Sequence, residues 1–116
     1  MKFKLIIVLV TDDMTNKITD VGRRAGATGC TVITSARGEG LVPPKTFLGL
    51  SLESQRDMIL FLVEQHRSRL ILETIAKAGK FDEKPGSGIA FQIDIEDAVG
   101  LESQLKTIEQ ELEDDL

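Results

Sequence analysis

Two glycine-containing segments hold the residues whose types and spacing are suited to binding a small molecule. The first is GATGCTVITSARGEG, from Gly26 to Gly40, and the second is GSGIAFQIDI, from Gly86 to Ile95. Glycine lets backbone N–H groups approach a phosphate closely and lets a loop change conformation when a ligand binds. Single glycines also end helices or form tight turns, and Gly26 and Gly29 are open to that structural interpretation. Each segment is therefore a candidate either for a ligand loop or for a purely structural turn.

Residues for covalent or metal chemistry are scarce. The chain has one histidine, His66, and one cysteine, Cys30, so it offers no Ser/His/Asp set and no cluster with metal-ligand spacing. No GxxxxGK[ST] motif is present. We interpret His66 as a solvated residue at a helix start and Cys30 as a small buried residue. The sequence favours a protein that is not an enzyme.

Hydrophobic periodicity indicates the elements that position these loops. The segment from Lys2 to Val10 and the segment from Asp57 to Val63 are apolar on both alternating faces, as in strands covered on both sides. We expect Asp12 or Asp13 to cap a helix that ends at Gly26. The remaining expected elements are a strand from Gly29 to Gly38, a hairpin arm over Thr46–Leu52, a helix over Arg67–Ala78 closed by Gly79, a strand over Ile89–Ile95 and a C-terminal helix from about Leu101 to Leu116.

Each amphipathic element predicts a buried face. In the last strand we expect Ile89, Phe91, Ile93 and Ile95 to face inward. The first helix should bury Met14, Ile18, Val21 and Ala25, and the second should bury Leu70, Ile71, Thr74, Ile75 and Ala78.

The order βαββαβ predicts an α+β, ferredoxin-like sandwich with an extra C-terminal helix. Right-handed crossovers place the first and third strands at the centre of a four-stranded antiparallel sheet, with both helices on one face. The apolar residues on the other face then need a second partner, and the simplest partner is another copy of the chain. We therefore expect a homo-oligomer.

Composition limits the function classes further. The 116 residues suit a single domain, 1–116, and the net charge of −5 argues against a nucleic-acid partner. The apolar start MKFKLIIVLV is followed too soon by TDD for a signal peptide or a membrane span, and a lone cysteine forms no internal disulfide. We expect a soluble cytoplasmic protein without direct membrane insertion.

The two glycine segments together resemble the PII nitrogen-regulatory signal-transduction family. Gly26, Thr28, Gly29 and Thr31 match that family's G-x-T-G-x-T turn, and Gly38 and Gly40 match the G-x-G at the base of its mobile loop. Gly86 to Ile95 looks like its second glycine loop running into strand four. The order of strands and helices agrees between the two segments, so the resemblance covers roughly residues 2–101.

The resemblance implies a trimer that regulates other proteins and does no chemistry on a substrate. Adenine nucleotides (ATP or ADP), and often 2-oxoglutarate, would bind in clefts between subunits, and a mobile loop over about 38–47 would dock onto an enzyme or transporter. The ligand residues implied in this way are Thr31 near the adenine, Gly38 and Gly40 at the loop base, and Gly86, Ser87 and Gly88 beside the phosphates. We add Arg37, which directly precedes Gly38, as a further candidate ligand residue. The implied partner-binding residues are Leu41, Val42, Lys45 and Phe47.

Several positions depart from the family pattern. Leu41-Val42 replaces the usual Arg-Gln, Gly86-Ser87-Gly88-Ile89 replaces G-D-G-K, and Glu96-Asp97-Ala98 stands where the family has arginines. The loss of a cation from a phosphate site removes a contact of about 1.5–3 kcal/mol. Arg37, Lys45, Lys80 or Lys84 could compensate. With no tyrosine in the chain, Ser51 or Ser54 would be the substitute for a modified loop residue.

Two other classes share this architecture. One is a CutA-like divalent-metal-tolerance trimer, against which the single cysteine, single histidine and missing tryptophan argue. The other is a free-standing ACT-like small-molecule-binding domain. Metal content and ligand-dependent thermal shifts separate these alternatives from a PII-like protein.

Overall fold

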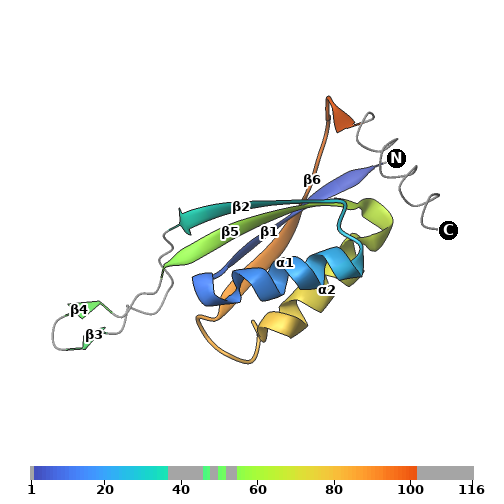
Figure 1. The fold of residues 1–116 in the computed structure, drawn as a ribbon. Coiled ribbons are helices and arrows are strands. Elements are labelled where there is room, and N and C mark those ends of the chain that lie inside the picture. The colour runs from blue at the N-terminus through green and yellow to red at the C-terminus, as the bar shows by residue number, and fades with distance from the viewer. Residues whose placement is uncertain (1, 37–45, 48–49, 52–54, 102–116) are drawn as a thin grey trace.

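The computed structural model describes residues 2–36, 46–47, 50–51 and 55–101. The chain order is strand, helix, two strands, helix and strand, with a short hairpin inserted before the third main strand (Figure 1). The elements are β1 (Phe3–Thr11), a 3-10 turn (Asp12–Met14), α1 (Thr15–Ala25), β2 (Gly29–Ala36), β3 (Thr46–Phe47), β4 (Leu50–Ser51), β5 (Arg56–Glu64), α2 (Gln65–Gly79) and β6 (Gly88–Asp94).

The main sheet has the order β2-β5-β1-β6 and is antiparallel throughout. Both helices cover the same face of it, as Figure 1 shows. This arrangement confirms the ferredoxin-like α+β fold and the central position of the two strands that are apolar on both faces. The strands β3 and β4 form a separate antiparallel pair, which agrees with the expected hairpin arm over Thr46–Leu52.

In each central strand, the alternate side chains that face the helices form the core. Fully buried side chains from β1 and β5 meet fully buried isoleucines of α1 and α2. These core residues are Ile6, Val8, Val10, Ile18, Ile59, Phe61, Val63, Ile71 and Ile75. The expected apolar stripe of α1 is confirmed, because Met14, Val21 and Ala25 pack against this core around Ile18.

The remaining alternate side chains form a second apolar surface on the other side of the sheet. We call this surface the open face because neither helix covers it. Strand pairing arranges it in three rows across the four strands. The rows are Ile33–Met58–Leu9–Ile89, Thr31–Leu60–Ile7–Phe91 and Gly29–Leu62–Leu5–Ile93. Large side chains stay accessible there, with Ile89 54% and Ile93 46% exposed.

The prediction that the large apolar residues Ile89, Phe91 and Ile93 of β6 face inward was wrong. Ala90 packs against the core, whereas Ile89, Phe91 and Ile93 lie on the open face. The side-chain oxygen Oε1 of Gln92 is buried and has no hydrogen-bond partner among the described residues. Alternation shows that every second side chain of the strand is apolar, but it does not show which face of the sheet these side chains occupy. Here both faces of the sheet are apolar, so either orientation is compatible with the pattern.

Three details of the helices also differ from expectation. Helix α2 ends one residue later than predicted, because Lys80 takes the left-handed conformation (φ 54°) that we expected of Gly79. Leu70 is 62% exposed rather than buried. Asp12 lies in the 3-10 turn, and neither that turn nor α1 has a side-chain capping hydrogen bond. The end of α1 is as predicted, since Gly26 caps it with φ 117°.

The predicted C-terminal helix lies, beyond Leu101, outside the described residues, as does most of the predicted mobile loop 38–47. No helix in the described part of the chain combines the length and apolar character needed to cross a membrane.

Candidate ligand-binding loops

The second glycine loop, residues 80–88, is folded on itself between α2 and β6. The backbone N–H groups of Glu83 and Lys84 both donate to the Lys80 carbonyl, at 3.2 and 3.0 Å. The N–H of Ser87 donates to the Lys84 carbonyl at 3.1 Å. These bonds give the loop a defined shape before any ligand is considered.

The hydroxyl of Ser87 also serves the loop. Its Oγ lies 2.7 Å from the Lys84 carbonyl and 3.2 Å from the Lys80 carbonyl, and it donates to both. A serine hydroxyl has one proton, so in this conformation only its lone pairs are left for a ligand. A phosphate, which accepts hydrogen bonds, would have to draw that proton away from the two carbonyls.

Gly86 occupies the tip of the loop with a positive φ of 79°. Apart from its two chain neighbours, no described residue lies within 4 Å of the position that a Cβ would take. Its carbonyl accepts a hydrogen bond of 2.9 Å from Nη2 of Arg56, the first residue of β5. Sequence reasoning missed Arg56. The available signal was a cation directly before an apolar strand and directly after a long loop.

Gly88 begins β6 opposite Val10. A Cβ there would lie 2.8 Å from the Leu9 carbonyl oxygen and 2.6 Å from Cε1 of Phe81. Glycine is therefore required at this position for packing, whatever its role toward a ligand.

Thr31 lies in the middle of β2, exposed on the open face and opposite Leu60. Strand β2 is one edge of the sheet, and β6, which follows the 80–88 loop, is the other. Three strand spacings separate the two edges, which is roughly 14 Å. One chain therefore does not bring Thr31 together with Gly86, Ser87 and Gly88.

The part of the first segment that follows β2 leaves the sheet at the same end as Gly86. Ala36, the last residue of β2, pairs with Arg56, which also pairs with Thr11. The remaining predicted residues of this loop, Arg37, Gly38, Gly40, Leu41, Val42 and Lys45, lie outside the described residues, and Phe47 is described only as part of β3.

Charges near the second loop are mixed. Lys80 and Lys84 are exposed and share the loop with the exposed Asp82 and Glu83. The carboxylates of Glu96 and Asp97 come after the far end of β6, because Asp94 pairs with Lys4 and Gly88 pairs with Val10. Within one chain those carboxylates are therefore remote from the second glycine loop.

The reactive side chains of Cys30, His66 and Asp57 belong to strands and a helix and not to the 80–88 loop. Desolvation raises the pKa of the Cys30 thiol, and the nearby Arg23 charge offsets this in part. His66 is exposed in the first turn of α2. The buried Asp57, which sequence reasoning also missed, accepts a 2.6 Å hydrogen bond from Thr15 Oγ1 at the start of α1. No group of three or more His, Cys, Asp or Glu side chains suited to a metal occurs within the described ranges.

An antiparallel sheet with helices on one face and glycine loops at its edges defines the class as a ferredoxin-like α+β domain. The chain matches the family model of the nitrogen regulatory protein P-II over residues 3–104, and it belongs to that family. This match confirms the resemblance carried by the two glycine segments. P-II proteins are regulatory proteins rather than enzymes.

Solved structures show the same fold. The protein CPII from Thiomonas intermedia, solved bound to ADP, AMP and acetate, is 21% identical with a TM-score of 0.65 and covers 86% of this chain and 92% of its own. A putative PII-like signaling protein from Thermus thermophilus is 21% identical with a TM-score of 0.60 and covers 82% of this chain and 87% of its own. No curated protein matches the chain.

Proposed function

We propose that this protein is a trimeric cytoplasmic regulator that binds an adenine nucleotide between its subunits and signals occupancy to a partner protein through residues 38–47. The partner is a regulated enzyme or transporter, and the chain itself performs no catalysis. The P-II family match supports the regulatory role.

The open face is the observation that carries this proposal. Its three rows contain no charged side chain, and ten of the twelve positions are Leu, Ile, Met or Phe. Burial of one such side chain stabilises an assembly by about 1.5–3 kcal/mol. A single chain leaves several of them accessible, so copies of the chain gain this free energy by packing their open faces together.

A ring of copies also explains why the two halves of the candidate site lie on opposite edges. In a closed ring each interface is heterologous, so one edge region of a subunit meets the opposite edge region of the next. Thr31 of one subunit then faces the loop of Gly86, Ser87 and Gly88 of its neighbour. The ligand cleft forms only on assembly.

An adenine nucleotide is the ligand class that fits best. CPII has been solved with ADP and AMP, together with acetate in one structure and bicarbonate in another. In this chain Thr31 lies beside Ile33 and Leu60 on the open face, an apolar surface suited to a base. Lys80 and Lys84 stand in the other loop as the available cations for phosphate.

Native mass spectrometry and calorimetry with ADP, AMP and ATP test this function. We expect a species of three chain masses and saturable binding of at least one nucleotide. A monomer, or a trimer without heat of binding at millimolar nucleotide, would contradict it. The second result would direct attention to the metal or amino-acid ligands of the CutA-like and ACT-like alternatives.

The role of the loop is tested separately by deletion of Leu41 to Thr46. We expect this variant to remain trimeric and to bind a regulated partner no longer. Loss of the trimer would instead make the segment part of the assembly.

A further inference from the structure

Arg56 connects three parts of the molecule at one end of the sheet. Its backbone pairs with Ala36 at the end of β2 and with Thr11 at the end of β1. Its guanidinium donates a 2.9 Å hydrogen bond to the Gly86 carbonyl. The residue thus links the position where the chain leaves β2 with the tip of the second glycine loop.

The bond to Gly86 is one of two hydrogen bonds that orient the Gly86–Ser87 peptide group. Gly86 has a positive φ, and among the described residues only its chain neighbours come within 4 Å of a Cβ position, so side-chain packing from this part of the protein does not hold it. The same peptide unit carries the N–H of Ser87, which donates to the Lys84 carbonyl. Arg56 on one side and Lys84 on the other therefore determine how this peptide is oriented.

We propose that Arg56 is a positioning residue for ligand binding: it holds the Gly86–Ser87 peptide in place and couples the 80–88 loop to the Ala36–Arg56 pair at the end of β2. The proposal rests on the proposed nucleotide function for its ligand, but the arginine acts through the loop. Ligand-dependent movement of the loop alters the Arg56 contact, and by linkage any change at the Ala36–Arg56 pair alters ligand affinity.

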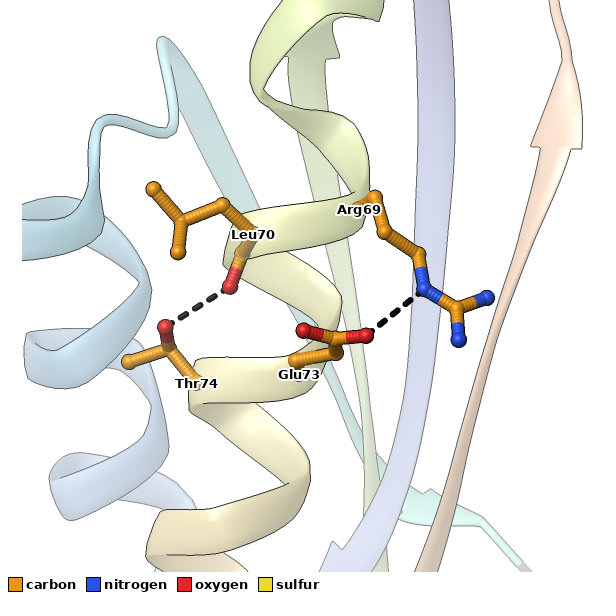
Figure 2. Close-up of polar contacts among 4 residues, drawn as sticks. All are labelled: Arg69, Leu70, Glu73 and Thr74. Atoms are coloured by element: carbon orange, nitrogen blue, oxygen red, sulfur yellow. Dashed lines mark hydrogen bonds and ion pairs between the residues drawn. The ribbon is translucent and has the colours of Figure 1, made fainter.

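Arg69 provides a matched control. It is an exposed arginine on α2 whose Nε lies 2.8 Å from Glu73 Oε1, one helical turn away (Figure 2). The variant Arg69→Met removes a charge of the same kind without touching the 80–88 loop. The test variant is Arg56→Met, which keeps the aliphatic stem, and Arg56→Lys restores a single cationic donor.

The first measurement is amide hydrogen exchange of the full-length protein without nucleotide. In Arg56→Met we expect exchange of the Ser87 amide to accelerate about tenfold, the change that corresponds to loss of one charge-assisted hydrogen bond. Core amides such as that of Phe61 should stay unchanged, and Arg56→Lys should restore part of the protection. Equal exchange in Arg56→Met and Arg69→Met would overturn the assignment.

The second measurement repeats the exchange with saturating ADP and determines its affinity by calorimetry. We expect the wild-type chain to change its exchange at Ala36 and Arg56 when ADP binds. We expect Arg56→Met to lose that change and to bind ADP roughly tenfold more weakly. Wild-type affinity and response in Arg56→Met would overturn this inference and leave the proposed function standing. No ADP binding by the wild-type chain would overturn both.

Discussion

Gly22 in α1 lies directly against the ring of Phe61 on β5. A Cβ at this position would come within 2.6 Å of the Cζ atom of Phe61, which is fully buried and unable to move aside freely. The glycine is thus a packing requirement rather than a source of flexibility. Sequence analysis assigned it no role, because close approach between an element and a distant ring leaves no local signal.

Gly22→Ala is expected to lower the free energy of unfolding by about 1–2 kcal/mol, because overpacking costs more than the helix propensity gained. Gly29→Ala is the control, since its Cβ would meet only Leu62 Cβ at an ordinary 3.7 Å. Urea unfolding at one fixed protein concentration compares the two. Equal stability would show that the Phe61 ring moves readily.

The thiol of Cys30 should react slowly with alkylating reagents. Burial raises its pKa, so a smaller fraction is thiolate at a given pH, and the thiolate is the reactive form. Iodoacetamide labelling of the folded protein between pH 7 and pH 9 should lag behind that of the urea-unfolded chain at every pH. Faster labelling of the folded protein would mean that the charge of Arg23 outweighs desolvation.

At the scale of elements, the start of α1 is joined to β5 by a buried hydrogen bond. Thr15 Oγ1 donates to Asp57 Oδ2, and both residues are less than 9% exposed. The carboxylate also lies at the positive end of the helix dipole. This contact fixes how α1 begins and stands in for the side-chain cap that neither Asp12 nor Asp13 provides.

Thr15→Val should therefore lower the free energy of unfolding by about 1–3 kcal/mol, because it leaves a buried carboxylate without its donor. Thr19→Val is the control, as Thr19 Oγ1 donates to the Asn16 carbonyl within the same helix. Thermal unfolding of the two variants distinguishes them. A loss in Thr19→Val as large as that in Thr15→Val would refute the role of Asp57.

The strands also show what hydrophobic periodicity can predict and what it cannot. The apolar character of β1 and β5 on both faces placed them correctly at the centre of the sheet. The same reasoning failed for β6, because Ile89, Phe91 and Ile93 face the open side. Alternation is a property of the strand alone, whereas the choice of face depends on what packs against each side.

For the candidate site, local motifs identified the glycine loops but not the contacts that shape them. The motif GSG singled out Gly86, Ser87 and Gly88, yet the Arg56 contact to Gly86 spans 30 positions in sequence. Glycine is needed at position 88 because a Cβ would collide with the Leu9 carbonyl and the Phe81 ring. The spacing of residues in a motif carries no information about these two contacts. Long-range contacts of this kind follow from the fold.

The open face gives a prediction about assembly. Phe91→Glu places a charge in the middle row of that face, where assembly would bury it, so we expect the proposed trimer to dissociate. Leu70→Glu is the control, because Leu70 is 62% exposed on α2, on the helical side of the sheet (Figure 2). Native mass spectrometry of the two variants measures which of them still forms a trimer. A Phe91→Glu trimer would show that the open face does not join the copies.

At the scale of the whole molecule, we propose that the small domain is one part of a larger assembly. Its sheet has an apolar core face and an apolar open face, and two helices cover only the first. The candidate ligand residues lie on opposite edges of that sheet. Both features are explained together if three copies close into a ring with shared sites.

The most direct test of this central claim is subunit complementation. Thr31→Gln fills one half of the proposed cleft, and Ser87→Asp adds a negative charge to the other. We expect each variant alone to form a trimer that binds no ADP. In trimers reassembled from an equal mixture, about a quarter of the interfaces combine two intact halves, so roughly a quarter of the sites should bind ADP in calorimetry. Trimers of the mixture that bind no more ADP than either variant alone would contradict a site shared between subunits.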